Sequence, residues 1–321
     1  MSLIRQSDYE SYDYREFWQD NKRLYEDQSE RLAVRKLLGK IDCSGKIFID
    51  LGCGFGRLFN EYSGFEKIIL VDYSLKNVEN AKNIITNFLN QNPEKLNDVY
   101  FFVADINSLP FRSDSMDIVL TVRVIHHLLK PEVFFTEVNR VIKDRGYFVL
   151  EFANKKNLKN ILRFFFGMLK QSPFNLTPFK IGDTILNFHP LFIRKLLEGN
   201  GFKVLKQISV SNFRLTFIKK IIVLKLLLFL ENIYQNLFSF AELGPSIFYK
   251  ANYLKDISQE LFLDNANNKC NKRKIFSDIR EILLCPSCRQ DKLEFLNSGK
   301  IYCPICKRNF KIVNNIYNFK I

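Results

Sequence analysis

Between residues 46 and 152, short apolar segments alternate with amphipathic ones, and this alternation restricts the folds open to the chain. Continuous apolar strands separated by helices are typical of a parallel sheet that is covered on both faces. In such a sheet, ligands bind at the carboxyl ends of the strands. We therefore predict an α/β domain with its site at that edge. The expected strands are "KIFIDL" (46–51), "KIILVD" (67–72), "VYFFVAD" (99–105), "MDIVLTV" (116–122) and "GYFVLEF" (146–152).

The regular alternation stops after residue 152. Two apolar insertions, at about 153–189 and 214–242, flank a helix at about 190–199 and a strand at 201–210, and a last strand follows at 246–253. Residues 255–277 are rich in Asn, Lys and Asp and read as a linker. We predict one domain over residues 1–254 and a second, small one over residues 278–321.

A glycine-rich turn follows the first expected strand. Gly52, Gly54 and Gly56 alternate with other residues, and Asp50 precedes them. Glycine allows the backbone to turn tightly and to approach a ligand closely. The nicotinamide fingerprint would need a glycine where Arg57 stands, and no Gly-Lys-Ser/Thr follows as in a phosphate-binding loop.

Carboxylates end the next two strands. Asp72 can accept hydrogen bonds from a ribose diol, and Asp105 can accept one from an adenine amino group. Several carboxylates without a lysine make a poor phosphate site and a good site for a cationic nucleoside.

Together these motifs resemble class I S-adenosylmethionine (SAM)-dependent methyltransferases. "DLGCGFG", "LVDYS", "ADINSLPF" and "MDIVLTVRVIHHL" stand in that family's order, and the resemblance covers residues 9–254. It implies a Rossmann-like, seven-stranded, mostly parallel sheet with helical insertions, and SAM as cofactor. It also implies that Asp50 orients the amino-acid end of the cofactor. The implied cofactor-binding residues are Asp50, Gly52, Gly54, Gly56, Asp72, Tyr73, Asp105 and Ile106.

The stretch before the first strand looks like the helix that closes over the cofactor in this family. Trp18, Tyr25 and Arg31 would then reach the cofactor; the alternative is amphipathic packing against the sheet.

Methyl transfer is a direct displacement that needs alignment and exclusion of water, and needs a general base only where the acceptor is protonated. Four residues, three just past or at the ends of expected strands and one at the end of the first insertion, are candidate bases, although a histidine beside a core strand more often packs or hydrogen-bonds. They are His126, His127, Glu151 and His189.

Two features of the sequence bear on the chemical class of the methyl acceptor: a missing motif and the two apolar insertions. The Asn/Asp-Pro-Pro-Tyr/Phe motif of amino-group methyltransferases would fall near Val122–Ile125 and is missing. The first insertion, with "ILRFFFGML", would line an apolar acceptor pocket or enlarge the domain. The second carries Lys219, Lys220 and Lys225 among apolar residues, and would touch a membrane surface or cap the first. Its 217–230 stretch is too charged for a transmembrane segment.

Four cysteines form two C-x-x-C pairs near the C-terminus, a spacing typical of a tetrahedral structural zinc site. No export signal precedes the domain, and the odd total of seven cysteines argues against a disulfide framework, so we expect a cytoplasmic protein. Cys43, Cys53 and Cys270 have no partner pattern. The predicted zinc ligands are Cys285, Cys288, Cys303 and Cys306.

The sequence around these cysteines resembles the zinc-ribbon protein that activates tRNA and release-factor methyltransferases, which implies a ribbon fused in cis that lends a strand and covers apolar surface. The alternative is a ribbon that binds nucleic acid through its lysines. From the sequence we expect zinc removal to unfold this segment only.

Three functions remain open. A SAM-dependent methyltransferase of a small-molecule or lipid acceptor fits the apolar insertions and the missing amine motif; "NFHPLFIRKLLEGNGFKVL" resembles small-molecule and quinone-type enzymes. An RNA or translation-factor methyltransferase fits the ribbon and the net charge of +14. A scaffold that binds the cofactor without catalysis is the third.

Overall fold

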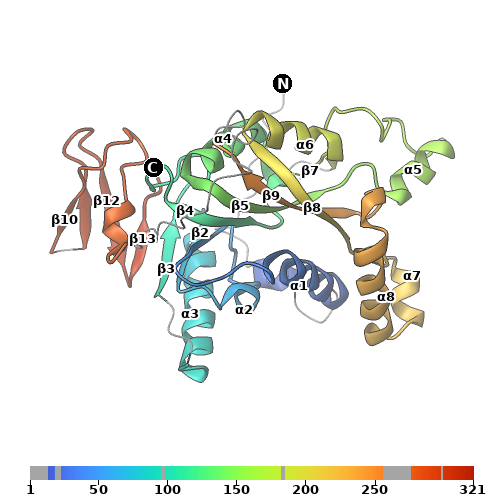
Figure 1. Ribbon diagram of the computed structural model, residues 1–321, viewed down its shortest axis with the longest axis horizontal. Helices are drawn as coiled ribbons and strands as arrows, with labels where there is room; N and C mark the ends of the chain where they lie inside the picture. Colours follow the sequence, from blue (N-terminus) through green and yellow to red (C-terminus); the bar gives the residue numbers. More distant parts are fainter. Residues whose placement is uncertain (1–13, 19–22, 95–97, 182–184, 256–275, 298) are drawn as a thin grey trace, which may run out of the picture.

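The computed structural model describes residues 14–18, 23–94, 98–181, 185–255, 276–297 and 299–321. Its centre is one large sheet with the strand order β10-β11-β12-β13-β3-β2-β1-β4-β5-β9-β8 (Figure 1). The strands β13, β3, β2, β1, β4 and β5 run parallel, and β9 is antiparallel to both of its neighbours. The prediction of a mostly parallel α/β sheet is confirmed.

The predicted number of strands is wrong for this sheet, which has eleven rather than seven. Seven of them come from the part of the chain before residue 254. They are β1 (Ile47–Leu51), β2 (Lys67–Asp72), β3 (Asp98–Val103), β4 (Met116–Thr121), β5 (Ile142–Ala153), β8 (Phe202–Val210) and β9 (Ser246–Tyr253). The other four belong to the C-terminal segment, which extends the same sheet instead of standing apart from it.

Helices cover both faces of the sheet because side chains alternate between the faces along each strand. Phe48 packs with α1 (Leu24–Leu38) and α3 (Leu75–Gln91) in one core, and α2 (Phe59–Tyr62) contributes to it. Ile47, Ile49 and Leu51 pack with α4 (Pro131–Val141) and α6 (Pro190–Gly199) in the other. Pro131 opens α4, as predicted, where its missing N–H costs nothing.

Each of the two predicted insertions contains at least one helix outside the central sheet. The first holds α5 (Leu158–Phe165) and a small hairpin of β6 (Phe179–Ile181) and β7 (Ile185–Asn187). The second holds α7 (Thr216–Ile221), α8 (Leu224–Leu237) and the 3-10 turn η3 (Ser239–Ala241). Both lie at the end of the molecule opposite to the C-terminal segment (Figure 1).

The C-terminal segment is a ribbon that docks on the free edge of β3. It comprises η5 (Ile279–Ile282), β10 (Glu294–Leu296), β11 (Lys300–Tyr302), β12 (Asn309–Val313) and β13 (Ile316–Asn318). β13 pairs in parallel with β3, and Phe102 of β3 stacks on Tyr317 with ring centroids 4.8 Å apart. Apolar residues of the ribbon, including Phe310 and Phe319, belong to the main core. The domain boundaries stay a prediction, and residues 256–275 of the predicted linker lie outside the described residues.

Candidate active site

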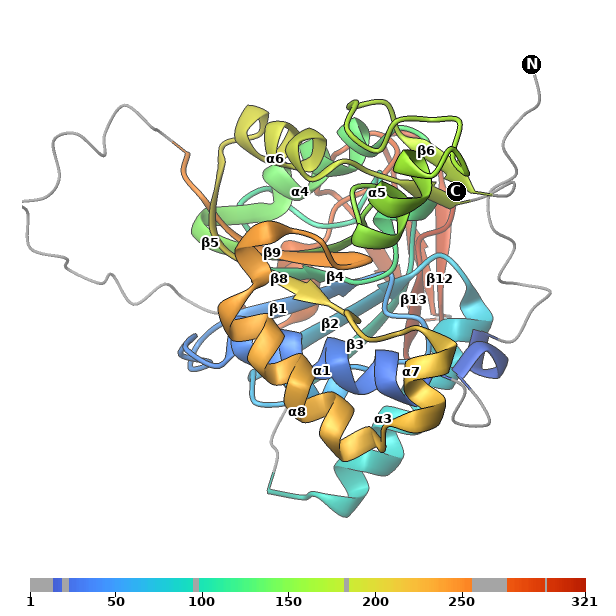
Figure 2. The ribbon, with the colours of Figure 1, turned by 90° about the vertical axis from the view of Figure 1, so that its right-hand side faces the viewer.

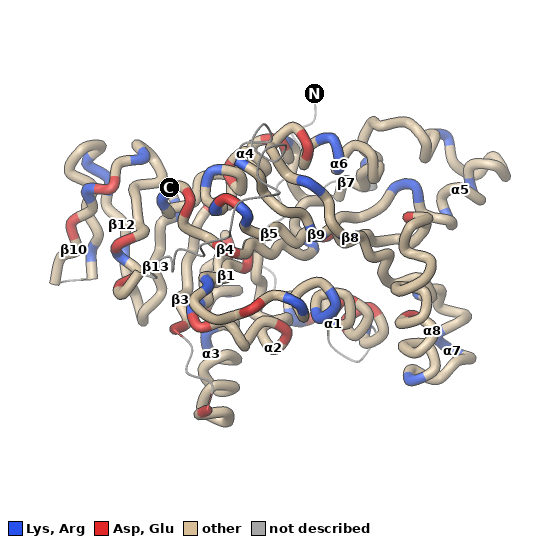
Figure 3. The backbone as a smooth tube through the Cα atoms, viewed as in Figure 1, with Lys and Arg blue, Asp and Glu red and all other residues tan. Residues whose placement is uncertain are grey.

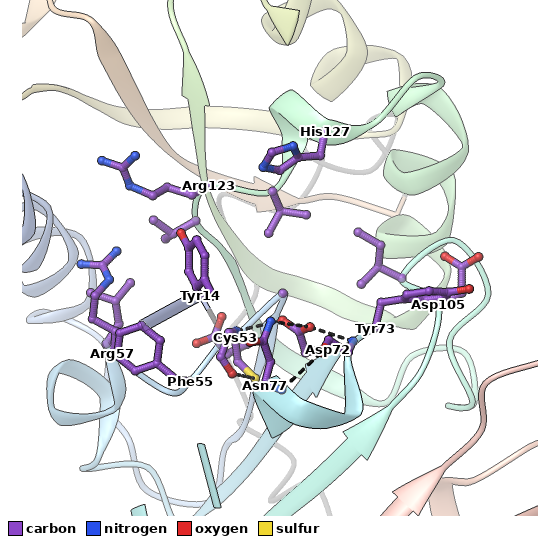
Figure 4. A pocket seen from close by; sticks show the side chains of 18 of the residues that line it. Tyr14, Cys53, Phe55, Arg57, Asp72, Tyr73, Asn77, Asp105, Arg123 and His127 are labelled. Carbon is purple, nitrogen blue, oxygen red and sulfur yellow. Dashed lines mark hydrogen bonds between the residues drawn. The ribbon is translucent and has the colours of Figure 1, made fainter. Parts of the chain in front are cut away.

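A cavity of about 390 Å³ opens at the carboxyl ends of β1, β2 and β4 and beside the segment that follows β3 (Figure 4). Its volume lies in the range of small-molecule and cofactor sites. It is lined by residues 14, 50, 52–55, 57, 58, 72–74, 77, 105–107, 122–124, 127, 128 and 320. Seven of the eight predicted cofactor-binding residues are among them, and Gly56 is not.

In the turn after β1, the three glycine positions have little or no room for a side chain. Gly52 has φ +77°, and a Cβ there would stand 2.2 Å from Cγ2 of Val124. Gly54 has φ +55°, and a Cβ there would meet the ring of Tyr14 at 3.3 Å. Gly56 lies against helix α3, where a Cβ added to it would clash with Ile85. The turn therefore brings bare backbone to the cavity wall at its first two glycines, while the third serves helix packing.

Asp72 fastens this turn to the end of β2. One carboxylate oxygen accepts from the N–H of Gly54 (2.9 Å), and the other accepts from the N–H of Ser74 (2.9 Å) and from the side chain of Asn77 (3.2 Å). A charged acceptor on several donors is a strong arrangement. Asp72 thus has a structural role beside the ribose contact that the sequence predicts.

Asp105 lies across the cavity from the glycine turn (Figure 4). Its Oδ1 accepts from the backbone N–H (2.8 Å) and the side-chain amide (3.0 Å) of Asn107, which fixes the carboxylate. Its Oδ2 accepts no hydrogen bond within the described part of the chain. An acceptor oxygen held at the cavity wall fits the predicted adenine contact.

Asp50 is a fully buried carboxyl group at the wall of the cavity. Burial raises its pKa to about 7, against the opposing effects of the Tyr62 hydroxyl, which donates to Asp50 at 2.6 Å, and of Arg57. Desolvation disfavours the charged form of a carboxyl group. Asp50 therefore titrates near neutral pH, where a cationic partner would draw it into the ionised form.

We expect the affinity for S-adenosylhomocysteine (SAH) to rise as the pH rises from 6 to 8. If the Asp50 carboxylate binds the ammonium end of the cofactor, the raised pKa means that protonation of Asp50 competes with binding below pH 7. The loss at pH 6 should approach about tenfold. Calorimetric titration over this range measures it, and the Asp50→Asn variant should bind weakly with a flat profile. A wild-type profile that is already flat would contradict the role of Asp50.

The N-terminal segment covers the cavity with a different residue from those predicted. Tyr14, at the start of the 3-10 turn η1 (Tyr14–Trp18), lines it. Trp18 lies behind, with the guanidinium carbons of Arg57 and Arg123 at 4.0 and 4.9 Å from its ring. Tyr25 donates to Glu231 (2.6 Å), and Arg31 pairs with Asp27 and Glu61. Neither Tyr25 nor Arg31 lines the cavity.

Arg123 lines the cavity just beyond β4. Its backbone has φ +61°, an unusual conformation for a residue with a side chain, and its N–H donates to Glu151 (2.8 Å). Its guanidinium binds the fully buried Glu30, which also accepts from Arg57 (2.6 Å). Burial alone would raise the pKa of Glu30, but the two arginines more than offset this, so the pKa is lowered. The pair of arginines holds α1 and η1 against the cavity.

Among the four candidate bases, only His127 lines the cavity. His126 is buried beneath it; burial pushes its pKa well below the usual value, and its Nδ1 has no hydrogen-bond partner in the described part of the chain. Glu151 is buried between the Arg123 N–H and the Ser246 hydroxyl. His189 caps helix α6, where its Nδ1 accepts from the Leu191 N–H (3.1 Å). A catalytic role stays a prediction for all four, and the placement favours His127.

A residue of the ribbon also reaches the cavity, which the sequence did not suggest. Lys320 follows β13 and lines the cavity, with its ammonium 4.0 Å from the ring centroid of Tyr73. The Phe319 N–H donates to the Val103 carbonyl (2.8 Å) and so aligns the end of the ribbon with the end of β3. The expectation of a site without lysine is wrong, because a strand added from the far end of the sequence brings one.

We expect Lys320→Ala to weaken SAH binding about two- to fivefold, because Lys320 holds the Tyr73 ring at the cavity wall and a cation over an exposed ring contributes about 0.5–1 kcal/mol. Lys311→Ala, on β12 of the same ribbon and outside the cavity lining, is the matched control and should leave affinity unchanged. Calorimetric titration compares them. Equal effects of both substitutions would mean that Lys320 acts only through the ribbon's stability or net charge.

The four predicted zinc ligands converge on one point. The sulfur atoms of Cys285, Cys288, Cys303 and Cys306 all lie within 4.8 Å of one another, and two pairs lie 3.5 Å apart. Sulfurs bound to one tetrahedral zinc at about 2.3 Å would lie about 3.8 Å apart. The cluster is therefore compatible with a structural zinc site. Cys43 and Cys53 are not part of it, and Cys270 lies outside the described residues.

Comparison with known proteins decides the enzyme class. Residues 49–150, about a third of the chain, match the model of a methyltransferase domain. The chain contains a methyltransferase domain. This match agrees with the methyltransferase domain that the motifs predicted, and it spans the glycine turn, Asp72, Asp105 and the end of β4. Three carboxylates and a bare backbone turn around one cavity fit SAM as the cofactor.

The curated relatives share only part of their length with this chain. An uncharacterized protein from Methanocaldococcus jannaschii is 30% identical over 56% of this chain and 63% of its own length. A malonyl-[acyl-carrier protein] O-methyltransferase from a Marinomonas species is 25% identical over 43% of this chain and 50% of its own. The chain thus spans less than two thirds of either relative.

One solved structure is similar to this chain at a low level. Magnesium protoporphyrin IX methyltransferase from Synechocystis with bound SAH has a TM-score of 0.48 and 18% identity, over 74% of this chain and 87% of the other. A likeness at this level carries no information about the acceptor.

None of the helices in the described part of the chain has the length and apolar character needed to cross a bilayer.

Proposed function

We propose that this chain transfers a methyl group from SAM to a small-molecule or lipid acceptor. This proposal rests on the composition of one wall of the cavity, which we take as the acceptor side. The segment after β4 forms this wall from Val122, Arg123, Val124, His127 and Leu128. Its side chains are mostly apolar, and the Pro-Pro motif that holds amino-group acceptors is absent from it. A mostly apolar pocket suits a compact apolar acceptor better than a charged polymer.

Within this proposal, SAM supplies the activated methyl group, and the chain's residues bind and position the reactants. Asp50, Asp72 and Asp105 hold the cofactor, and Tyr14 excludes water from it with Trp18 packed behind. Arg123 lies on the acceptor side with its guanidinium paired to Glu30. His127, which lines the cavity, would accept the proton that a hydroxyl acceptor releases, whereas a carboxylate acceptor would need no base. The four cysteines hold a structural zinc.

An RNA or translation-factor acceptor is the second candidate. It is supported by the net charge of +14 and by the resemblance of the ribbon to the activator of tRNA and release-factor methyltransferases. A cofactor-binding scaffold without catalysis is the third. A cytoplasmic location stays a prediction.

One labelling experiment separates the three. The purified protein is incubated with methyl-tritiated SAM and an extract of the cells that make it, and the product is then partitioned. Label in the organic or small-molecule fraction supports the proposal, whereas label in acid-precipitable material that nuclease or protease releases establishes the second candidate. No label above the Asp72→Asn control, from a protein that binds SAH, would establish the scaffold.

A further inference from the structure

The first insertion presents an amphipathic helix with its apolar side outward. Leu158, Leu162, Phe165 and Phe166 are spaced to share one face of α5, and all four are exposed. Phe165 and Phe166 keep 71% and 73% of their surface accessible, and no residue of α5 is buried. A surface helix normally turns its apolar stripe toward the core. Here the stripe faces away from it, and Met168 continues the exposed surface.

The second insertion also exposes large apolar side chains on its helices. Helix α7 has no buried residue, and Phe217 is 72% exposed. The exposed apolar surface continues along α7 and α8 and into η3, through Ile221, Val223, Leu226, Phe229 and Phe240. Scattered exposed apolar residues are normal on a soluble protein, but a contiguous set of large ones marks an interaction surface.

The two insertions are joined and share one end of the molecule. The Leu158 N–H donates to the Leu243 carbonyl (2.9 Å), and the Asn154 side chain donates to the carbonyls of Glu242 and Gly244 (2.8 Å each). In Figure 2, where this end faces the viewer, α5 and the α7–α8 pair both lie in front. We call the exposed residues of α5, α7 and α8, with Phe166, Met168, Val223 and Phe240, the apolar end.

The charge of the apolar end indicates what it contacts. Residues 154–181 hold six basic and no acidic residues, and residues 212–230 hold four basic and no acidic residues. Lys155 and Lys219 are engaged inside the protein, with Asn175 and Glu26. Five others are exposed and make no ion pair within the described part of the chain: Lys159, Arg163, Lys170, Lys220 and Lys225. Figure 3 shows the basic residues around α5 without an acidic neighbour on that segment.

We propose that the apolar end binds the surface of an anionic phospholipid bilayer. Outward aromatic side chains flanked by unpaired lysines and arginines suit a headgroup layer, where the rings enter the acyl boundary and the cations meet phosphates. A second copy of this chain would place these five unpaired positive charges against the same five of its partner. The contact is peripheral.

The test uses the full-length zinc-loaded protein and vesicle co-sedimentation. We expect binding to vesicles that contain about one third phosphatidylglycerol, weak binding to pure phosphatidylcholine, and release by salt. Replacing Phe165, Phe166, Phe217 and Ile221 by Ser should weaken binding at least about 100-fold, because each apolar side chain returned to water costs a factor of several. Changing Lys159, Arg163, Lys220 and Lys225 to Gln should remove the preference for anionic lipid.

The control changes exposed apolar residues at the opposite end, on the ribbon: Leu296, Ile305 and Val313, each to Ser. This variant should bind vesicles as the wild type does. Absence of binding to anionic vesicles by a folded protein would overturn the proposal. A wild-type dimer that the apolar-end substitutions dissociate, together with absence of vesicle binding, would assign the surface to a second copy. The assay needs no turnover, so its result is independent of the acceptor.

Discussion

Removing zinc from the purified protein is expected to lower the melting temperature of the whole methyltransferase fold by about 10 °C and to weaken SAH binding. The sequence alone predicted unfolding of the C-terminal segment only. The shared sheet changes this expectation, because loss of the ribbon would uncover the fully buried Phe102 and Phe111 and remove the paired edge of β3. Exposing two large aromatic side chains costs about 3 kcal/mol, which corresponds to about 10 °C for a domain of this size.

The measurement is calorimetric unfolding and SAH titration before and after chelation, with metal content determined in parallel. Cys288→Ser should reproduce the effect without a chelator, and Cys43→Ser, which changes a cysteine outside the cluster, should not. A melting temperature that is unchanged when one equivalent of metal has left would show that β13 stays docked without zinc. A protein that never carries metal would refute the zinc site itself.

The largest effect on cofactor binding is expected from Asp72→Asn, which should weaken SAH about 100-fold. The substitution removes the charge that would accept hydrogen bonds from a ribose diol, and such charged bonds are each worth about 1.5–3 kcal/mol. It also weakens the tie between Asp72 and the Gly54 N–H, which shapes the glycine turn. Asp98→Asn, on the exposed edge of the same sheet, is the control and should bind normally.

A double-mutant cycle separates the two roles of Asp72. The ribose hydroxyls are removed from SAH, and the loss of affinity is compared in the wild type and in Asp72→Asn. If the carboxylate binds the hydroxyls, their removal should cost little once Asp72 is changed. Additive losses would show that Asp72 acts only by shaping the turn, and an Asp72→Asn variant with wild-type affinity would refute the site assignment.

The parts of the site that local patterns encode were predictable. A strand followed by glycines, and carboxylates at the ends of the next two strands, occupy a common edge of the parallel sheet because the alternation of strands and helices requires it. Asp50, Asp72 and Asp105 therefore line one cavity, as their positions indicated. The four cysteines converge because two short pairs of ligands suffice to define a tetrahedral site.

Other features depend on angles and pairings that spacing does not encode. His126 and His127 are neighbours on one 3-10 turn, η2 (Ile125–His127), and a rotation of about 120° per residue puts one in the core and the other in the cavity. Tyr14 and Trp18 also share one 3-10 turn, η1, and of these two only Tyr14 lines the cavity. Lys320 reaches Tyr73 only because β13 pairs with β3, a pairing between distant segments that no local pattern announces.

The docking of β13 on β3 has a consequence for the order in which the protein is made. During synthesis β3 leaves the ribosome long before β13, so the nascent methyltransferase fold carries an open strand edge and a bare aromatic surface until the last ribbon strand arrives. If the four cysteines bind zinc as predicted, completion of that edge also depends on metal, since a ribbon of this size has little apolar core of its own. Zinc supply to the cell should therefore set how much of the newly made chain escapes aggregation, independently of how active the finished enzyme is.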